Sequence, residues 1–342
     1  MNEYKTILLK PDQNGVKEAG DLLRHGELVA IPTETVYGLA ASALDSDAVR
    51  RIFEAKGRPQ DNPLIVHIAD IGQLDSLVMD VPDVAKKLAQ TYWPGPLTMV
   101  MKRSTVVPDV VSAGLFTVAV RMPSHPIARS IIRAAGVPLA APSANRSGSP
   151  SPTTAAHVML DMGGKIPAVV DGGECSVGVE STVVDLSGET PRLLRPGGIT
   201  PEMLRCVTHE LMMDPAVTAR LEEGVVAASP GMKYKHYSPK ARVILVKGTP
   251  EAFSEFVNSQ KGEGIAAMCF DGEESALNVP YVTYGSRQNA DEQAHRVFDA
   301  LRRLDDIDAK IVYCSCPDPK GMGLAVYNRL LRAAGFEVIM LD

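Results

Sequence analysis

Short apolar runs alternate with segments of helical spacing along the N-terminal part of the chain. In residues 14–25 the apolar side chains recur every three or four positions, which predicts a helix that Asn14 caps and Gly26 ends. The runs that follow are short and bounded by Gly or Pro, as is typical of buried strands. Helices are predicted at 45–55 and 81–93, and strands within 27–33, 63–68, 93–103, 115–123, 136–154, 166–173 and 179–188.

The pattern changes near residue 212 and becomes regular again after residue 240. Strand-like and helical segments then alternate, which favours a small parallel α/β domain. Strands are predicted within 241–248, 264–270 and 309–318, and helices within 251–260, 291–306 and 324–335. Between the two regular parts, residues 212–239 carry lysines, a histidine and tyrosines near Pro and Gly, with little apolar periodicity.

These patterns predict an α/β protein of two domains. Residues 1–211 are expected to form an open, twisted mixed sheet with flanking helices and a concave anion-binding face. Residues 212–239 are expected to be a linker, and residues 240–342 a smaller Rossmann-like parallel α/β domain. A length of 342 residues with 45% hydrophobic content agrees with two hydrophobic cores.

The balance of charge limits the class of partner. The formal net charge is −6, and residues 241–342 account for −4 of it, with 11 Lys/Arg against 15 Asp/Glu. An acidic total argues against a dominant nucleic-acid-binding surface, and the C-terminal part is the poorer candidate for binding an anion. The segment MNEYKTILLK lacks the features of a signal peptide, and no apolar run approaches the roughly 20 residues that span a bilayer. A cytoplasmic location is expected.

The five cysteines do not predict a disulfide framework, because their number is odd and they are scattered over a long chain. Cys314 and Cys316 alternate at strand spacing, which favours buried thiols. No second pair of Cys or His stands at the spacing of a zinc site.

Candidate chemistry is concentrated between Ile31 and His67. This stretch holds a Pro-Thr-Glu-Thr turn, then Lys56 and Arg58, then an apolar run that ends at His67. Each residue alone has an ordinary structural explanation, such as cations at a helix C-terminus or a histidine in a core. A P-loop is absent, because the Gly-Gly-Lys at 163–165 lacks the following Ser or Thr.

Several motifs occur together in a specific order. They are PTETVYGLA, KGRP followed by NPL and a histidine, WPGPLT, VAVRMP, APSAN, ESTVVD and LRPG. In this order they resemble the YrdC-like threonylcarbamoyl-AMP synthases, and SPGMKYKHYSP with the C-terminal part resembles the longer, two-domain form of that family. The resemblance covers nearly the whole chain.

The resemblance implies an activity. Such enzymes convert L-threonine, bicarbonate or CO2, and ATP into threonylcarbamoyl-adenylate and pyrophosphate, and other proteins transfer the threonylcarbamoyl group to tRNA beside the anticodon. Mg2+ is expected to accompany ATP without a dedicated protein site, and weak tRNA binding is conceivable by analogy. Two alternatives stay open: a double-stranded RNA or tRNA binding module, and a carbamoyl-adenylate-forming enzyme of the hydrogenase-maturation type.

The resemblance also implies site residues. Lys56 and Arg58 are expected to act in catalysis, with Lys56 near the phosphates. The expected ATP contacts are Arg58, Asn62, Thr117, Ser143, Asn145, Ser151, Arg195 and, from the linker, Tyr234. The expected threonine contacts are Thr35, His67, Arg121, the backbone of Ala141, and Ser181, with Arg121 as the partner of the carboxylate. The linker is expected to close over the nucleotide.

Overall fold

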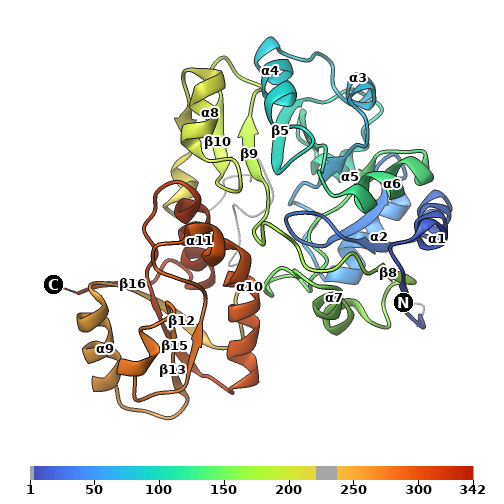
Figure 1. Ribbon diagram of the computed structural model, residues 1–342. Coiled ribbons are helices and arrows are strands. Elements are labelled where there is room, and N and C mark those ends of the chain that lie inside the picture. Colours follow the sequence, from blue (N-terminus) through green and yellow to red (C-terminus); the bar gives the residue numbers. More distant parts are fainter. Residues whose placement is uncertain (1–3, 221–236, 342) are drawn as a thin grey trace.

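The computed structural model describes residues 4–220 and 237–341 of the chain (Figure 1). The first part forms one sheet of eleven strands with helices on both sides, and the second part forms a separate sheet of five strands. The predicted fold class is therefore confirmed. The predicted linker residues 221–236, Tyr234 among them, lie outside the described residues.

The first sheet is mixed. Its strand order is β1-β8-β2-β3-β7-β4-β6-β5-β9-β10-β11. Parallel pairs such as β4 with β6 and antiparallel pairs such as β5 with β6 both occur in it. The strands are β1 Ile7–Leu9, β2 Val29–Ile31, β3 Gly38–Ser42, β4 Ile65–His67, β5 Leu97–Lys102, β6 Thr117–Arg121, β7 Leu139–Ala140, β8 Ala168–Val170, β9 Thr182–Asp185, β10 Arg192–Arg195 and β11 Met212–Met213.

Helices connect and cover these strands. They are α1 Gln13–Arg24, α2 Ser46–Lys56, η1 Ile71–Gln73, α3 Leu74–Leu77, α4 Asp83–Tyr92, α5 Asp109–Ser112, α6 Pro126–Ala135, α7 Ala155–Met162, α8 Pro201–Thr208 and η2 Pro215–Val217. The prediction of Asn14 as the cap of the first helix was wrong. Asp12 caps α1 instead, and its Oδ1 accepts from the Gly15 backbone N–H at 2.9 Å.

The second sheet is parallel throughout, as predicted, with the order β14-β13-β15-β12-β16. Its strands are β12 Arg242–Lys247, β13 Ile265–Cys269, β14 Tyr281–Thr283, β15 Ile311–Ser315 and β16 Val338–Met340, and its helices are α9 Pro250–Ser259, η3 Glu274–Ala276, α10 Ala290–Asp306 and α11 Met322–Ala333. Figure 1 shows α10 and α11 on the side toward the first domain and α9 on the opposite side.

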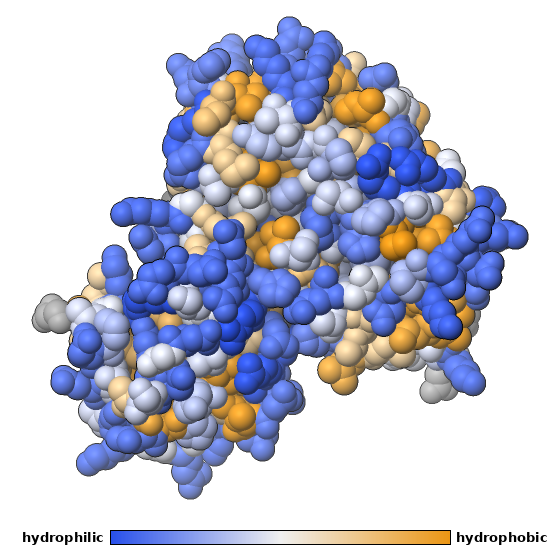
Figure 2. Space-filling view, in the orientation of Figure 1, coloured by the Kyte–Doolittle hydropathy of each residue, from blue (hydrophilic) through white to orange (hydrophobic). Residues whose placement is uncertain are grey.

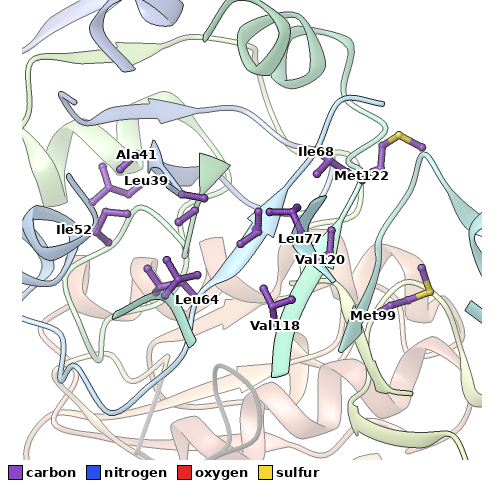
Figure 3. Packing of buried hydrophobic residues seen from close by; sticks show 14 of the residues in the cluster. Leu39, Ala41, Ile52, Leu64, Ile68, Leu77, Met99, Val118, Val120 and Met122 are labelled. Carbon is purple, nitrogen blue, oxygen red and sulfur yellow. The ribbon is translucent and has the colours of Figure 1, made fainter. Parts of the chain in front are cut away.

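The core of the first domain is built from aliphatic side chains of several strands and helices. Figure 3 shows part of it, with Leu39 and Ile52 on one side and Val120 and Met99 on the other. The core of the second domain also includes Val36 and Val179 of the first domain, so the two domains share an apolar contact. On the face shown in Figure 2, hydrophilic side chains cover most of both domains.

The cysteines are distributed over both domains as free thiols. All five cysteines are free, and all except Cys206 are buried. Of the helices in the described part of the chain, none combines the length and the apolar character needed to cross a bilayer.

Gly197 marks a point where two segments of the first domain approach closely. A Cβ at this position would lie 2.3 Å from the Thr182 backbone nitrogen and 2.5 Å from the Glu180 carbonyl oxygen. Such distances require the backbone to move. Glycine therefore allows the turn after β10 to lie against the start of β9.

We expect Gly197→Ala to destabilise the protein by about 1–3 kcal/mol, the usual cost of an overpacked site. Thermal unfolding measures the effect, and Gly188→Ala is the matched control because a Cβ there meets no atom within 4 Å. Equal melting temperatures for the two variants would contradict the close approach.

Candidate active site

A pocket in the first domain collects side chains from segments that are far apart in the sequence. It lies where the segment after β2, the end of α2, the strands β4 and β6, and the loop after β7 come together. Its lining residues are Thr33, Thr35, Val36, Gly38, Lys56, Arg58, Ile65, His67, Arg121, Ala141, Pro142, Ser143, Asn145, Ser147, Gly148, Glu180, Ser181, Arg195 and Tyr237.

The end of α2 places two cations at this pocket. Asp45 caps the helix, and Gly57 ends it with a left-handed backbone at φ 61°, as is common for glycine after a helix. Lys56 is thus the last helical residue, and Arg58 follows the turn. The Arg58 guanidinium donates long hydrogen bonds to the carbonyls of Pro63 at 3.3 Å and Asn62 at 3.4 Å.

Lys56 holds the loop that follows β7. Its buried Nζ donates to the carbonyl oxygens of Ser143 and Asn145 and to Asn145 Oδ1 at 3.2 Å. These three acceptors match the three donors of an ammonium group. Burial, and next the nearby Arg58 charge, lower the pKa of Lys56 well below its ordinary value.

The Ser143–Asn145 loop is fixed further by its own side chains. Ser143 Oγ donates to Asn145 Oδ1 at 2.6 Å, and Asn145 Nδ2 donates to the carbonyls of Arg146 at 2.8 Å and Ser149 at 2.7 Å. The backbone N–H of Ser147 donates to the Lys56 carbonyl at 2.9 Å. The loop therefore keeps one shape against the end of α2.

Arg121 stands at the end of β6 and is only 3% exposed. Its Nη2 lies 2.7 Å from Glu34 Oε1, and its Nη1 donates to Thr35 Oγ1 at 2.8 Å. Burial opposes ionisation of Glu34, but the charge and hydrogen bond of Arg121 outweigh it, so the pKa of Glu34 lies below its ordinary value. The pair is an ionised one with little access to water.

His67 ends β4 next to Arg121, with which it is in register. Its Nδ1 lies 3.3 Å from the Ile65 carbonyl. Burial, followed by the Arg121 charge, lowers the pKa of His67 to about 3, so the imidazole is neutral near pH 7. The backbone N–H of Ala141 donates to the same Ile65 carbonyl at 3.0 Å. Of the two backbone groups of Ala141, the carbonyl is therefore the one that can accept a hydrogen bond from a ligand.

Ser181 and Arg195 form the opposite wall. Arg195 Nε donates to the Ser181 carbonyl at 3.0 Å, and its Nη2 donates to Ser181 Oγ at 3.1 Å. Ser181 Oγ also lies 2.8 Å from Thr98 Oγ1. Arg195 is 6% exposed, and burial lowers its pKa from the ordinary value.

The structure brings most of the predicted site residues into this pocket. Those that line it are Thr35, Lys56, Arg58, His67, Arg121, Ala141, Ser143, Asn145, Ser181 and Arg195. Asn62, Thr117 and Ser151 do not line it. Ser151 lies directly behind the pocket, because its Oγ donates to Oε1 of the lining residue Glu180. Asn62 is buried, and its Oδ1 has no hydrogen-bond partner among the described residues. Thr117 starts β6, opposite Lys102 of β5.

The sequence did not single out the two buried carboxylates, Glu34 and Glu180. Both stand inside motifs, directly before Thr35 and Ser181. An acidic residue directly beside hydroxyl-bearing residues in each motif was the signal that could have indicated them. Tyr237, near the end of the predicted linker, also lines the pocket. The sequence analysis predicts an ATP contact for Tyr234 of the same linker, which lies outside the described residues.

Two family models match the chain. One, described as "Telomere recombination" and named for Sua5, YciO and YrdC, covers residues 21–197, and the other, described as "Threonylcarbamoyl-AMP synthase, C-terminal domain", covers residues 199–335. Together they account for both domains of an α/β protein whose pocket gathers cations and hydroxyls. The chain belongs to the Sua5/YrdC family in its two-domain form, which confirms the resemblance seen in the motifs.

Curated relatives that match nearly the whole chain are threonylcarbamoyl-AMP synthases. A threonylcarbamoyl-AMP synthase of Pyrococcus abyssi is 47% identical over 95% of both chains, and one of Bacillus subtilis is 44% identical over 95% of this chain and 94% of its own. The crystal structure of P. abyssi Sua5 complexed with L-threonine superposes with a TM-score of 0.92, at 43% identity, over 98% of this chain and all of that one. These matches do not favour the two alternatives, an RNA-binding module and a carbamoyl-adenylate-forming enzyme.

We expect His67→Asn to remove part of the pH dependence of stability. The unfolded imidazole binds a proton below pH 6.5, whereas the folded one stays neutral until about pH 3. Stability conferred by the neutral form is therefore lost as the pH falls from 6.5, by up to about 1.4 kcal/mol per pH unit.

Urea unfolding of the wild type and of His67→Asn at pH 7.5, 6.0 and 5.0 measures this difference. The gap in unfolding free energy should shrink toward acid pH. A gap that stays constant would mean that His67 becomes protonated in the folded protein.

Proposed function

We propose that this protein is an L-threonylcarbamoyladenylate synthase that uses L-threonine, bicarbonate or CO2, and ATP. The observation that carries the proposal is the convergence of Arg58, Ser143 and Arg195 on one pocket with Thr35 and Arg121. These residues come from five separate stretches of sequence. Cations and hydroxyls gathered in this way suit a triphosphate held against an amino acid.

The reaction is an adenylyl transfer. The amine nitrogen of threonine first bonds to the carbon of CO2, with loss of a proton, or of bicarbonate, with loss of water, and a carbamate forms. A carbamate oxygen then attacks the α-phosphorus of ATP, the bond from this phosphorus to the β-phosphate oxygen breaks, and pyrophosphate leaves. Such a step depends on positioning and charge neutralisation and needs no covalent intermediate on the protein.

In this proposal Arg58, Ser143, Asn145 and Arg195 contact the nucleotide in the pocket. The ATP contacts expected of Asn62, Thr117 and Ser151, which do not line the pocket, stay predictions. Arginine suits this role because its planar fork can bind two phosphate oxygens. Lys56 acts through the loop: its donors are directed at Ser143 and Asn145, so it holds these residues toward the phosphates.

Threonine lies in the part of the pocket that holds Thr35, His67, Arg121, Ala141 and Ser181. Arg121 binds the carboxylate, and it shares its charge with Glu34. Neutral His67 can accept a hydrogen bond from the threonine hydroxyl through a ring nitrogen. This division keeps the amine directed toward the α-phosphorus.

Mg2+ enters with the substrate, as MgATP. In residues 4–220 and 237–341, no three or more His, Cys, Asp or Glu side chains are grouped so that they could hold a metal ion. The two carboxylates near the pocket are already paired with arginines. We therefore assign the ion to the phosphates and route no step through a protein metal site.

The product is an activated, labile adenylate. We propose that the protein works in the cytoplasm and passes the threonylcarbamoyl group to tRNA-modifying transferase proteins, with at most weak direct tRNA binding. The test is pyrophosphate release by purified protein. Release should require threonine, bicarbonate and ATP and should need no RNA; carbamoyl phosphate should not replace threonine. Absence of threonine-dependent release would refute the proposal.

We expect Arg58→Ala to lower kcat/KM for ATP by about 100-fold or more, because it removes a preorganised cation at the phosphates. Thermal unfolding of the same variant separates this loss of activity from a loss of stability. Arg50→Ala is the matched control: it removes an arginine from the exposed face of α2, the helix that precedes Arg58. A loss of less than threefold in kcat/KM would remove Arg58 from the ATP site.

A further inference from the structure

The C-terminal domain reaches the wall of the pocket through one side chain of α11. Arg329 is fully buried, at 0% exposure. It belongs to the helix that Figure 1 shows against the first domain. A buried arginine at a domain boundary needs several acceptors for its donors.

Among the described residues, the acceptors beyond α11 that the Arg329 guanidinium contacts belong to two segments of the first domain. Its Nε donates to Glu180 Oε2 at 2.7 Å and its Nη2 to the Glu180 carbonyl at 3.1 Å. Its Nη1 donates to the Pro196 carbonyl at 2.9 Å. One planar group therefore joins the residue before Ser181 to the residue after Arg195.

These two segments form the wall described above, in which Arg195 donates to Ser181. Glu180 continues the connection, because its other carboxylate oxygen accepts from Ser151. Burial raises the pKa of Glu180, but Arg329 and then Arg195 outweigh it, and the net pKa lies below the ordinary value. The carboxylate is thus ionised and held from both sides.

We propose that Arg329 is a positioning residue of the active site: through Glu180 and Pro196 it fixes Ser181 for threonine and Arg195 for ATP. This inference rests on the proposed function and gives the C-terminal domain a part in it. The domain then does more than bury an apolar surface, since it supplies the charge that completes the pocket wall.

A second ion pair between the domains provides the matched control. Arg302 of α10 lies 2.7 Å from Asp161 of α7, and both side chains are largely buried. Asp161 does not line the pocket. Asp161→Asn removes one carboxylate from the domain boundary but leaves the hydrogen bond from Arg302 to the Pro150 carbonyl in place.

The experiment compares Arg329→Lys, Arg329→Gln and Asp161→Asn in the full-length protein. Lysine keeps the charge but lacks the fork that reaches three oxygens at once. We expect KM for both threonine and ATP to rise about tenfold or more in the two Arg329 variants. Asp161→Asn should lower the melting temperature and leave both KM values within twofold of the wild type.

A role limited to holding the domains together predicts a different result. It would lower the melting temperature and the active fraction, and hence the apparent kcat, while KM stays unchanged. Wild-type KM values in Arg329→Lys and Arg329→Gln, measured below their melting temperatures, would overturn the proposal.

A further pair of variants keeps the test decisive if the single Arg329 variants do not fold. Glu180→Gln with Arg329→Met removes both buried charges together, which proteins tolerate better than one unpaired charge. The KM values of this double variant should exceed those of Glu180→Gln alone, in which Arg329 still donates to the carbonyls of Glu180 and Pro196. Equal values would count against Arg329.

Failure of the proposed function has a separate signature. A wild-type protein that releases no pyrophosphate with threonine refutes the synthase activity, whatever Arg329 does. Calorimetric titration with ATP still reports on Arg329 in that case, because a displaced Arg195 should weaken nucleotide binding. An unchanged Kd for ATP in Arg329→Lys would refute the positioning role by itself.

Discussion

The structure depends on the compensation of buried positive charge around one pocket. Lys56, Arg121 and Arg195 are each less than a tenth exposed, and isolated charges in such surroundings are strongly unfavourable. Each has acceptors within reach: Lys56 has the loop carbonyls, Arg121 has Glu34, and Arg195 has Ser181. The cations needed for a triphosphate can therefore be held inside the protein before any ligand arrives.

This compensation also explains why the pocket is assembled from so many segments. The acceptors of the three cations lie on different segments: the Ser143–Asn145 loop for Lys56, the segment of Glu34 and Thr35 for Arg121, and Ser181 for Arg195. The mixed sheet brings β4, β6 and β9 near one another although they are distant in the sequence. Preorganised polar groups of this kind need little rearrangement when charge develops during a reaction.

The second domain packs directly against the pocket. Tyr237 lines the pocket and packs in the core of the second domain with Phe298, their ring centroids 5.1 Å apart. Val36 and Val179 of the first domain join that core. The domain boundary thus continues directly from the pocket wall, and a change at the boundary has a short physical route to the site.

Apolar periodicity and turn residues are local signals. They were therefore enough to predict the two α/β domains, most of the longer helices and strands, and the motifs that meet at the pocket. It missed short strands such as β1 and β16, which have three residues each. The folded chain was needed to show that Lys56 faces a loop, that Glu34 and Glu180 pair with arginines, and that Arg329 reaches the first domain. Charge pairing in a low-dielectric interior depends on which residues become neighbours in space. Glu180 and Arg329 become neighbours only when both domains have folded.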